Sequence, residues 1–425
     1  MSGSAGLDFM HRVVVTGLGT LNALGDTPAR TFAACLGGRS GVRRAPELAV
    51  NDTIPLVASA DFDARDVAPR QRCAPLDRAT GMALLVAREA VADAGAGLAI
   101  DSTRSGIYWG TGMGGAQTIE DGYRSVFRDN DWRLKPTSIV TGMNNAAAAV
   151  ISLELGVKGP VLTYSVACAS SAVAIGEAAR AIRHGDIDCA IAGGSEALLT
   201  KGIVSAWAAL RTLAREDPAD PARSCKPFSG ERSGFVLGEG AAAVTLESAE
   251  HAERRGARVY AELAGYGLGS DATHIADPSP DGQARAMTAA LRSAGIGPAD
   301  VGYINAHGTA TIVGDRVETE SIKRALGARA AAIPVSSTKA LHGHVMGATG
   351  AIEFVIALMA LQSGSIPPTA HLERRDPELG LDFVAEGARR GMKLSAVLSN
   401  SFAFGGTNAV LVACPAERGS PTLRG

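Results

Sequence analysis

The chain has 425 residues, enough for one large domain or two ordinary ones with a sizeable hydrophobic core. Apolar residues make up 46% of the sequence and charged residues 20%, a composition that fits a globular protein and excludes a disordered one. The net charge of −2 argues against a nucleic-acid-binding protein, for which a basic balance is expected.

Cysteine usage and the apolar segments indicate a soluble protein of a reducing compartment. Six cysteines are scattered along the chain without a CxxC pair, which favours neither a disulfide framework nor a zinc site. Residues 1–17 lack the charged-then-apolar order of a signal peptide. The best apolar run, residues 354–362, is too short to span a bilayer and predicts a buried helix. We therefore expect a cytoplasmic protein that needs no membrane.

The first predicted strand covers residues 13–16 and runs into a glycine-rich turn at Gly17, Gly19 and Gly25. These glycines do not make GxGxxG, so a dinucleotide site is weakly supported. Short apolar strands then alternate with helical patterns, and this alternation predicts an α/β fold with strands buried between helices. The clearest segments are a helix at 82–95 and strands at 105–112, 161–168, 188–197 and 241–247.

The pattern starts again near residue 256. Residues 257–269 predict a second strand that ends in a glycine turn. A helix at 283–295 and strands at 301–311, 332–340 and 393–406 follow. The order of elements predicts two similar halves, residues 1–250 and 251–425, joined near residues 248–256, although no close sequence repeat is visible.

Cys168 stands where the strand-forming residues 161–166 give way to a helical pattern rich in small residues. A cysteine at a helix N-terminus lies near unpaired N–H groups and the positive end of the helix dipole, which both favour the thiolate. A free cysteine is also commonly a small buried apolar residue. From this segment alone both interpretations stay open.

Three further segments place reactive side chains at strand ends, amid glycines. They contain His307 in residues 305–311, Lys339, His342 and His344 in residues 337–353, and a glycine pair in residues 400–412. A single histidine in such a place is more often structural. Ligands of open α/β sheets bind outside the carboxyl ends of the strands, so these segments could converge on one site.

Eight motifs along the chain resemble those of the elongating β-ketoacyl-acyl-carrier-protein synthases of the thiolase superfamily. In order they read VVVTGLGTLNALG, GTGMGGA, ACASSA, AGGSEA, KPFSGERSGFVLGEGAA, AHGTATIVGD, STKALHGHVMGATGAIE and NSFAFGGTN. The match covers nearly the whole chain, and the order of the motifs makes it specific. The resemblance implies a thiolase-like fold, in which two βαβαβαββ halves form a layered α-β-α-β-α core.

The resemblance implies a Cys-His-His catalytic site. Cys168 matches the nucleophile that accepts the acyl chain, His307 the histidine of the HGT motif, and His344 the histidine of the GH pair. His342 stands where many relatives have threonine, so we assign it no catalytic role. Phe404 matches the gating phenylalanine, whose backbone N–H forms an oxyanion hole with that of the cysteine.

Charged residues of the same motifs match supporting positions. Lys339 and Glu318 match a charged pair that braces the histidines, and Glu353 matches the acid of the following helix. An ordinary buried ion-pair network is the alternative for all three. We place Glu353 with Phe402 on the substrate-binding side of the site.

The implied reaction is a decarboxylative Claisen condensation of malonyl thioester with an acyl chain held on Cys168. The enolate that forms needs hydrogen-bond donors, which two neutral imidazoles can supply. Lys339 would discourage the histidines from taking an extra proton, through like-charge repulsion. Neither a metal nor another cofactor is expected, because the substrates ride on the phosphopantetheine arm of acyl carrier protein.

The substrate contacts follow from the same resemblance. Thr309 and Thr311 match threonines that hydrogen-bond the phosphopantetheine arm, and Met113 matches a position at the acyl pocket. Because carrier proteins are acidic, a basic patch is expected around the tunnel mouth. The candidates are Arg70, Arg72, Arg211 and Arg215, with a solvated face of mixed charge as the alternative for each.

Departures from the family pattern spare every catalytic position. Ser165, Val166, Ser229 and Ser233 replace more usual residues, and Ala403 stands where most relatives have glycine. Alanine at 403 should restrict the gating loop, since only glycine adopts positive φ at little cost. Synthases of aryl-polyene and related pathways can share the FAFGG form, so the pathway is either fatty-acid synthesis or a specialised type II polyketide route.

Two alternatives to an active synthase share its fold. A thiolase would carry a second cysteine near the C-terminus, where residues 400–408 offer none. A chain-length-determining partner subunit shares the fold but usually lacks the nucleophile, so Cys168 with both histidines argues against it. The family forms dimers, and either a homodimer or a heterodimer with a synthase-like subunit is expected.

Overall fold

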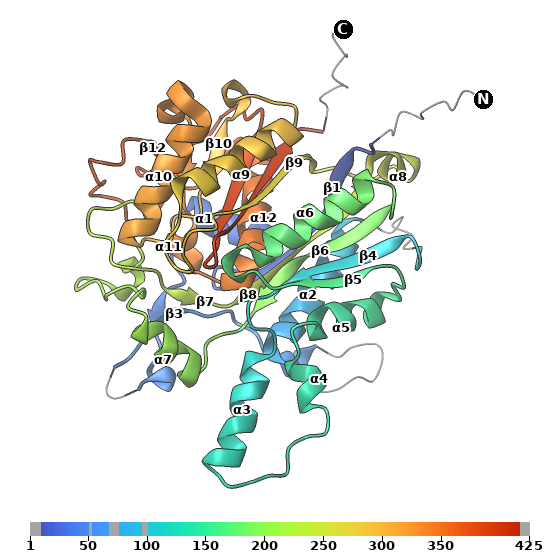
Figure 1. Ribbon diagram of the computed structural model, residues 1–425, viewed down its shortest axis with the longest axis vertical. Coiled ribbons are helices and arrows are strands. Elements are labelled where there is room, and N and C mark those ends of the chain that lie inside the picture. Colours follow the sequence, from blue (N-terminus) through green and yellow to red (C-terminus); the bar gives the residue numbers. More distant parts are fainter. Residues whose placement is uncertain (1–9, 51–52, 68–75, 96–100, 417–425) are drawn as a thin grey trace.

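A computed structural model describes residues 10–50, 53–67, 76–95 and 101–416. Its main sheet contains two sets of five strands (Figure 1). The N-terminal set is β1 (Val13–Asn22), β4 (Ser105–Gly110), β5 (Val161–Tyr164), β6 (Cys189–Glu196) and β8 (Gly240–Ser248). The C-terminal set is β9 (Ala261–Ser270), β10 (Tyr303–Asn305), β11 (Pro334–Ser336), β13 (Val397–Phe402) and β14 (Thr407–Cys414).

The two sets have the same topology. The N-terminal strands lie in the order β1-β8-β6-β4-β5 and the C-terminal strands in the order β9-β14-β13-β10-β11. In each set the first strand pairs antiparallel with the fifth, the fifth antiparallel with the fourth, and the second parallel with the fourth and the third. Antiparallel pairing of β1 with β9 joins the sets, and β12 (Asp382–Phe383) extends the C-terminal edge.

Helices complete a layered core around these strands. Helices α6 (Ser170–Arg183) and α12 (Thr349–Ser363) pack on each other between the two sets of strands. Helices α2 (Arg78–Asp93) and α5 (Ala146–Leu155) cover the outer face of the N-terminal set, and α9 (Pro280–Ser293) with α10 (Ile312–Leu326) covers the other outer face (Figure 1). The prediction of two βαβαβαββ halves in an α-β-α-β-α arrangement is confirmed.

The shorter elements connect this core. The helices are α1 (Pro28–Leu36), α3 (Ala116–Phe127), α4 (Ser138–Gly142), α7 (Lys201–Ala209), α8 (Ala249–Arg254) and α11 (Lys339–His342). The strands β2 (Arg43–Arg44), β3 (Leu56–Ala58) and β7 (Leu237–Gly238) form a small second sheet. Helix α8 lies where the two halves were predicted to join.

The central helix α12 explains the most apolar part of the sequence. The stretch Met346–Ser363 is long and apolar enough, by length and composition, to cross a membrane, but 83% of it is buried inside the protein. A helix that is apolar on all sides is expected where it is surrounded by other elements. The predicted buried helix at residues 354–362 is therefore confirmed.

The turns predicted at Gly17 and Gly19, and at the glycines of residues 257–269, are wrong, whereas Gly25 does lie in a turn directly after β1. Strand β1 continues through Gly17 and Gly19, and β9 continues through Gly265 and Gly267. A Cβ at Gly17 would overlap the carbonyl oxygen of Ala90 in α2, and Cβ atoms at Gly19, Gly265 and Gly267 would meet similar obstacles in α2 or α9. These glycines therefore let an outer helix lie close against the strand, a role that glycine can fill inside strands.

Replacing Gly267 by alanine should destabilise the protein, because the added methyl group would overlap the carbonyl oxygen of Ala286 in α9. Overpacking of this kind costs about 1–3 kcal/mol of the free energy of unfolding. A matched control lies two residues along the same strand, where a Cβ at Gly269 has no atom within 4 Å. Gly269→Ala should change the free energy by less than about 0.5 kcal/mol. Equal urea-unfolding midpoints for both variants would contradict the close packing of α9.

Candidate active site

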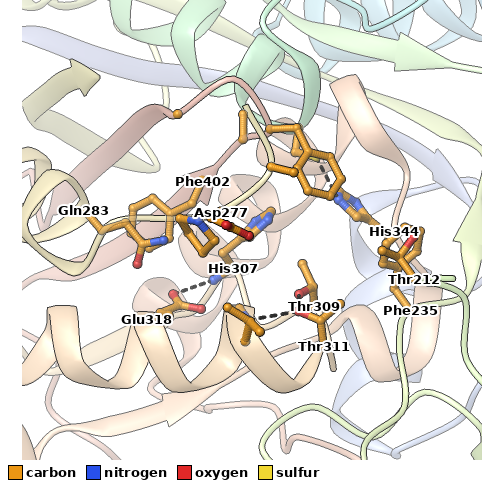
Figure 2. Close-up of a pocket in the computed structure, with 18 of the residues that line it drawn as sticks. Thr212, Phe235, Asp277, Gln283, His307, Thr309, Thr311, Glu318, His344 and Phe402 are labelled. Carbon is orange, nitrogen blue, oxygen red and sulfur yellow. Dashed lines mark hydrogen bonds between the residues drawn. The ribbon is translucent and has the colours of Figure 1, made fainter. Parts of the chain in front are cut away.

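The four segments singled out in the sequence converge on one cavity of about 420 Å³ (Figure 2). Cys168 comes from the 3₁₀ turn η3 (Ala167–Ala169) that joins β5 to α6. His307 follows β10, His344 follows α11, and Phe402 ends β13, so all four side chains lie at strand or helix ends. The convergence fits the rule that open α/β sheets bind ligands beyond the carboxyl ends of their strands.

Cys168 lies on a strained turn beside a histidine. The preceding Ala167 has a φ of 47°, in the left-handed region that non-glycine residues rarely adopt. The thiol is 4% exposed, and its Sγ lies 3.1 Å from Nε2 of His344. Burial raises the pKa of the Cys168 thiol to about 11, although Lys339 and the backbone N–H groups of Phe404 and Cys168 itself lower it.

Opposing effects act on the ionisation of this thiol, which the sequence left open. Helix dipoles and N–H groups do favour the charged form, but removal of the sulfur from water outweighs them here. Cys168 is therefore a neutral thiol at neutral pH. Its charged form is stabilised by N–H donors that already face the sulfur.

The hydrogen bonds of His344 identify its tautomer. The backbone N–H of Met346 donates to Nδ1 over 3.3 Å, and Oγ1 of Thr349 lies 2.9 Å from the same nitrogen. Because a backbone N–H can only donate, Nδ1 is an acceptor and the ring proton sits on Nε2. The Nε2–H therefore points at the sulfur of Cys168.

His307 completes the group of three. Its ring lies edge-on to that of His344, with centroids 5.5 Å apart, and it also contacts Phe402 (Figure 2). Its Nδ1 is buried and has no hydrogen-bond partner in the described part of the chain. Burial, and then the charge of Lys339, holds the pKa of both histidines well below its ordinary value. Both rings are therefore neutral and able to donate an N–H.

The charges around the histidines pair differently from what the sequence predicted. Lys339 forms its ion pair with Glu353, at 2.8 and 2.9 Å, and also donates to the backbone carbonyl of His307. Glu318 instead accepts the backbone N–H groups of His307 and Gly308, at 2.8 and 2.7 Å. The expected Lys339–Glu318 pair is thus replaced by two separate supports for the His307 segment.

Glu353 was also predicted on the substrate-binding side, and this placement is corrected. Its side chain is fully buried in α12, where it is bound to Lys339 and does not line the cavity. Burial raises the pKa of Glu353, whereas Lys339 lowers it. Glu318, by contrast, lines the cavity beside His307 (Figure 2).

The residues expected to hold the phosphopantetheine arm lie along the cavity. Thr309 and Thr311 both line it, and their hydroxyl oxygens are 3.0 Å apart (Figure 2). Phe404 lies at the rim, 36% exposed, and stacks on Trp207 at 6.1 Å between ring centroids. The structure brings these residues together, while their roles in binding stay predictions.

Ala403 does not strain the gating loop, contrary to our expectation. In this loop the positive φ values fall on Gly405 and Gly406, at 87° and 77°, and not on Ala403. The backbone of the loop is hydrogen-bonded to residues 271–275. The Gly405 N–H donates to the carbonyl of Ile275 over 2.7 Å, and the Asp271 N–H donates to the carbonyl of Gly406 over 2.9 Å. No sequence pattern singled out the segment 271–279, which also lines the cavity.

Of the residues predicted to contact the carrier protein or the acyl chain, only some line the cavity. Arg211 lines it, Arg215 does not, and Arg70 and Arg72 lie outside the described residues. Met113 is 47% exposed and also lies outside the cavity lining. The carrier-docking role of the arginines and the acyl-pocket role of Met113 stay predictions.

Among the described residues, Cys168, His307 and His344 form a group of side chains that could hold a metal ion. The sulfur of Cys168 and one nitrogen each of His307 and His344 lie within 4.8 Å of one another. Thiolate and imidazole are ligands that suit zinc. The ammonium group of Lys339, close enough to lower both histidine pKa values, opposes a dication at this place.

His342, which we assigned no catalytic role, lies outside the cavity. Its ring is fully buried, outside the cavity lining, with Nε2 2.9 Å from Oγ1 of Thr338. Burial and then Lys339 lower its pKa to about 3, so it is neutral.

The known proteins that this chain resembles include β-ketoacyl synthases and ketosynthases. Two family models match the chain: "Beta-ketoacyl synthase, N-terminal domain" over residues 10–252 and "Beta-ketoacyl synthase, C-terminal domain" over residues 260–373. A 3-oxoacyl-[acyl-carrier-protein] synthase 2 of Coxiella burnetii is 40% identical, over 95% of this chain and 98% of its own.

Two solved structures are similar over the whole fold. One is a type II polyketide ketosynthase in complex with its acyl-carrier protein, 30% identical, with a TM-score of 0.88 and coverage of 96% of this chain and all of the other. The other is the ishigamide ketosynthase/chain length factor, 31% identical, also with a TM-score of 0.88, and coverage of 96% and 99%.

Alkylation of Cys168 by iodoacetamide should speed up steeply with pH, because the thiol is protonated below its raised pKa and only the thiolate reacts. The rate constant, followed by intact mass, should rise about tenfold per pH unit between about pH 7 and 9.5. The Cys168→Ala variant is the control, because any alkylation that it still shows belongs to another cysteine and is subtracted. A plateau below about pH 8 would show a preformed thiolate and contradict the burial argument.

Replacing Lys339 by methionine should lower the free energy of unfolding by about 3–5 kcal/mol, because it leaves the buried carboxylate of Glu353 without its cation. The double variant Lys339→Met, Glu353→Leu should recover most of this loss, since a buried pair can be replaced by apolar side chains. Arg30→Met, which breaks an exposed pair with Asp26, should cost less than about 1 kcal/mol. Urea unfolding measures these variants together with Glu353→Leu alone, and a loss in the double variant equal to the sum of the two single losses would refute the pairing.

Proposed function

Because this chain belongs to the β-ketoacyl synthase family, we propose that Cys168 holds the acyl chain while His307 and His344 stabilise the enolate of malonyl thioester. The family assignment makes the protein a β-ketoacyl-acyl-carrier-protein synthase, an acyltransferase of fatty-acid or polyketide chain elongation. The observation that carries the residue roles is the Nε2–H of His344, 3.1 Å from Sγ, with His307 beside it.

In the first step the sulfur of Cys168 takes the acyl group from a carrier-protein thioester. The thiol loses its proton, the thiolate attacks the thioester carbonyl, and the phosphopantetheine thiol leaves with a proton. The oxyanion of the tetrahedral intermediate is stabilised by backbone N–H donors. The N–H groups of Cys168 and Phe404 lower the pKa of the Cys168 thiol, which supports this role for both.

In the second step the malonyl thioester of a second carrier protein loses CO₂. The two electrons of the broken C–C bond form an enolate, whose oxygen receives hydrogen bonds from the neutral rings of His307 and His344. Their low pKa values keep them from becoming cations, so they donate N–H groups without trapping the carboxylate as an ion pair.

In the third step the enolate carbon attacks the acyl-cysteine carbonyl. The new C–C bond lengthens the chain by two carbons, the carbonyl re-forms as the C–S bond to Cys168 breaks, and the released thiolate takes up a proton from solvent. The product is a 3-oxoacyl chain on the carrier protein. The fixed ring of His344 lies next to the sulfur in all three steps, and Lys339 and Glu318 hold the His307 segment.

The carrier protein docks at the cavity mouth. Arg211 on the lining, with Arg215, Arg70 and Arg72, supplies the basic patch that an acidic carrier requires. Thr309 and Thr311 bind the phosphopantetheine arm inside the cavity, Phe402 lies on the acyl side, and Met113 limits chain length. No metal or further cofactor takes part, and the enzyme works in the cytoplasm.

The chain divides at residues 250 and 251 into two halves and functions as a dimer. Exposed apolar side chains on α3, α4 and the segment between them support an interface there: Ile119, Tyr123, Phe127, Trp132, Ile139 and Val140. Strand β5 forms an edge of the main sheet. The partner is a second copy or a ketosynthase-like subunit, as in the similar ketosynthase/chain length factor.

Incubation with a medium-chain acyl carrier protein should add the mass of one acyl group to the protein and none to Cys168→Ala. His307→Ala should still be acylated, but its condensation with malonyl carrier protein should fall about 100- to 1000-fold, because one enolate donor is lost. Intact mass measures the loading, and chromatography of the released 3-oxoacyl product measures the condensation.

Two controls make the outcome decisive. Saturated and polyenoic chains of equal length, compared in the loading step, separate fatty-acid from specialised synthesis. The native mass of the same sample separates a dimer of this chain from a subunit that lacks its partner. If no chain is loaded with or without candidate partner subunits, the active-synthase roles fail and the chain-length-determining subunit becomes the better assignment.

A further inference from the structure

Glu196, at the end of β6, is a fully buried carboxylate that the reaction described above does not use. Its Oε2 accepts the backbone N–H of Gly112 at 2.5 Å and that of Gly347 at 2.9 Å. Its Oε1 accepts the Met113 N–H at 3.1 Å and the hydroxyl of Thr111 at 3.2 Å. One side chain thus joins the loop after β4 to the turn that precedes α12.

This turn, η7 (Met346–Ala348), controls His344. The N–H of Gly347 binds Glu196, and the N–H of the neighbouring Met346 donates to Nδ1 of His344. Thr349 also contacts Nδ1, but its hydroxyl can donate to a bare nitrogen or accept from a protonated one. The Met346 N–H is therefore the contact that decides the tautomer, and it depends on the position of the turn.

The fit around the carboxylate is tight. A Cβ at Gly112 would come within 2.8 Å of Oε2 of Glu196, and one at Gly347 within 2.6 Å of the same atom. Glycine at both places is thus what admits a carboxylate between the two loops. Glu196 also reaches Cys168 electrostatically, since its charge raises the pKa of the thiol.

We propose that Glu196 is a positioning residue of the condensation: it holds the Met346–Gly347 turn so that His344 keeps its proton on Nε2, directed at Cys168 and the enolate. This inference rests on the proposed function for the meaning of the tautomer. A displaced turn would let Thr349 accept from Nδ1–H, and the Nε2 of His344 would then face the reacting atoms as an acceptor, which repels an enolate oxygen.

The test is Glu196→Gln, whose amide keeps the shape but presents an NH₂ group to one pair of N–H donors. We expect the kcat of condensation to fall roughly 10- to 100-fold, with KM for malonyl carrier protein changed less than about threefold. In protein labelled with ¹⁵N-histidine, the ring signals of His344, assigned by their loss in His344→Ala, should show a protonated Nε2 in the wild type and a mixed tautomer in the variant.

Glu89→Gln is the control, because Glu89 is a partly buried glutamate that accepts a backbone N–H, from Thr20, and whose pKa burial raises to about 7, as it does for Glu196. It lies on α2, outside the cavity lining, and its variant should keep both the wild-type kcat and the His344 tautomer. If Glu196→Gln does not fold, Glu196→Asp, which shortens the reach to Gly347, should show the same changes.

A wild-type tautomer in a folded Glu196 variant would overturn the inference, whether or not kcat falls. A kcat equal to that of Glu89→Gln would overturn it as well. Failure of the proposed function is recognised separately, because the wild-type protein itself would then neither load an acyl chain nor condense it.

Discussion

The geometry of the candidate active site depends on the contact between the N-terminal ends of helices α6 and α12. Helix α6 begins just after Cys168 and helix α12 just after the His344 segment, and the two helices pack in the middle layer. The contact requires small residues, since a Cβ at Gly350 would come within 2.9 Å of the Ala172 side chain and 2.8 Å of the Ser401 hydroxyl. The Ala351 N–H donates to the hydroxyl of Ser171 across this contact, over 2.9 Å. Consequently Sγ of Cys168 lies 3.1 Å from Nε2 of His344, although the two residues are 176 positions apart in the sequence.

Burial in this layer sets the protonation states of the site residues, and it lowers stability wherever a buried charge lacks a partner. It keeps the histidines neutral and the thiol protonated, because charged forms are penalised away from water. The same burial obliges Lys339 to keep Glu353 as a partner, since an unpaired buried charge is strongly destabilising. Glu318 and Glu196 are instead satisfied by backbone N–H groups, which fix the loops that carry His307 and precede α12. Buried carboxylates are thus used here to fix backbone segments as much as to balance charge.

The duplicated topology explains why the site is divided between the halves. Each half contributes one central helix and one cluster of strand ends, so Cys168 comes from the first half, and His307 and His344 come from the second. In each half, glycines of the first strand, β1 or β9, let an outer helix lie directly against that strand. A pattern of residues that differs between the halves can therefore still produce the same arrangement of elements.

The sequence by itself determined the order of strands and helices, the two similar halves and the buried helix at residues 354–362, and it singled out Cys168, His307 and His344, which the structure brings together in one cavity. These rest on local periodicity and on ordered motifs, which are properties of neighbouring residues. Only the tertiary structure decided that β1 and β9 pass straight through their glycines, that Lys339 pairs with Glu353, that burial keeps Cys168 a thiol, and that Met346 sets the tautomer of His344. Each of these depends on which distant groups lie within a few ångströms and on how far water is excluded, and neither quantity is encoded in the spacing of residues along the chain.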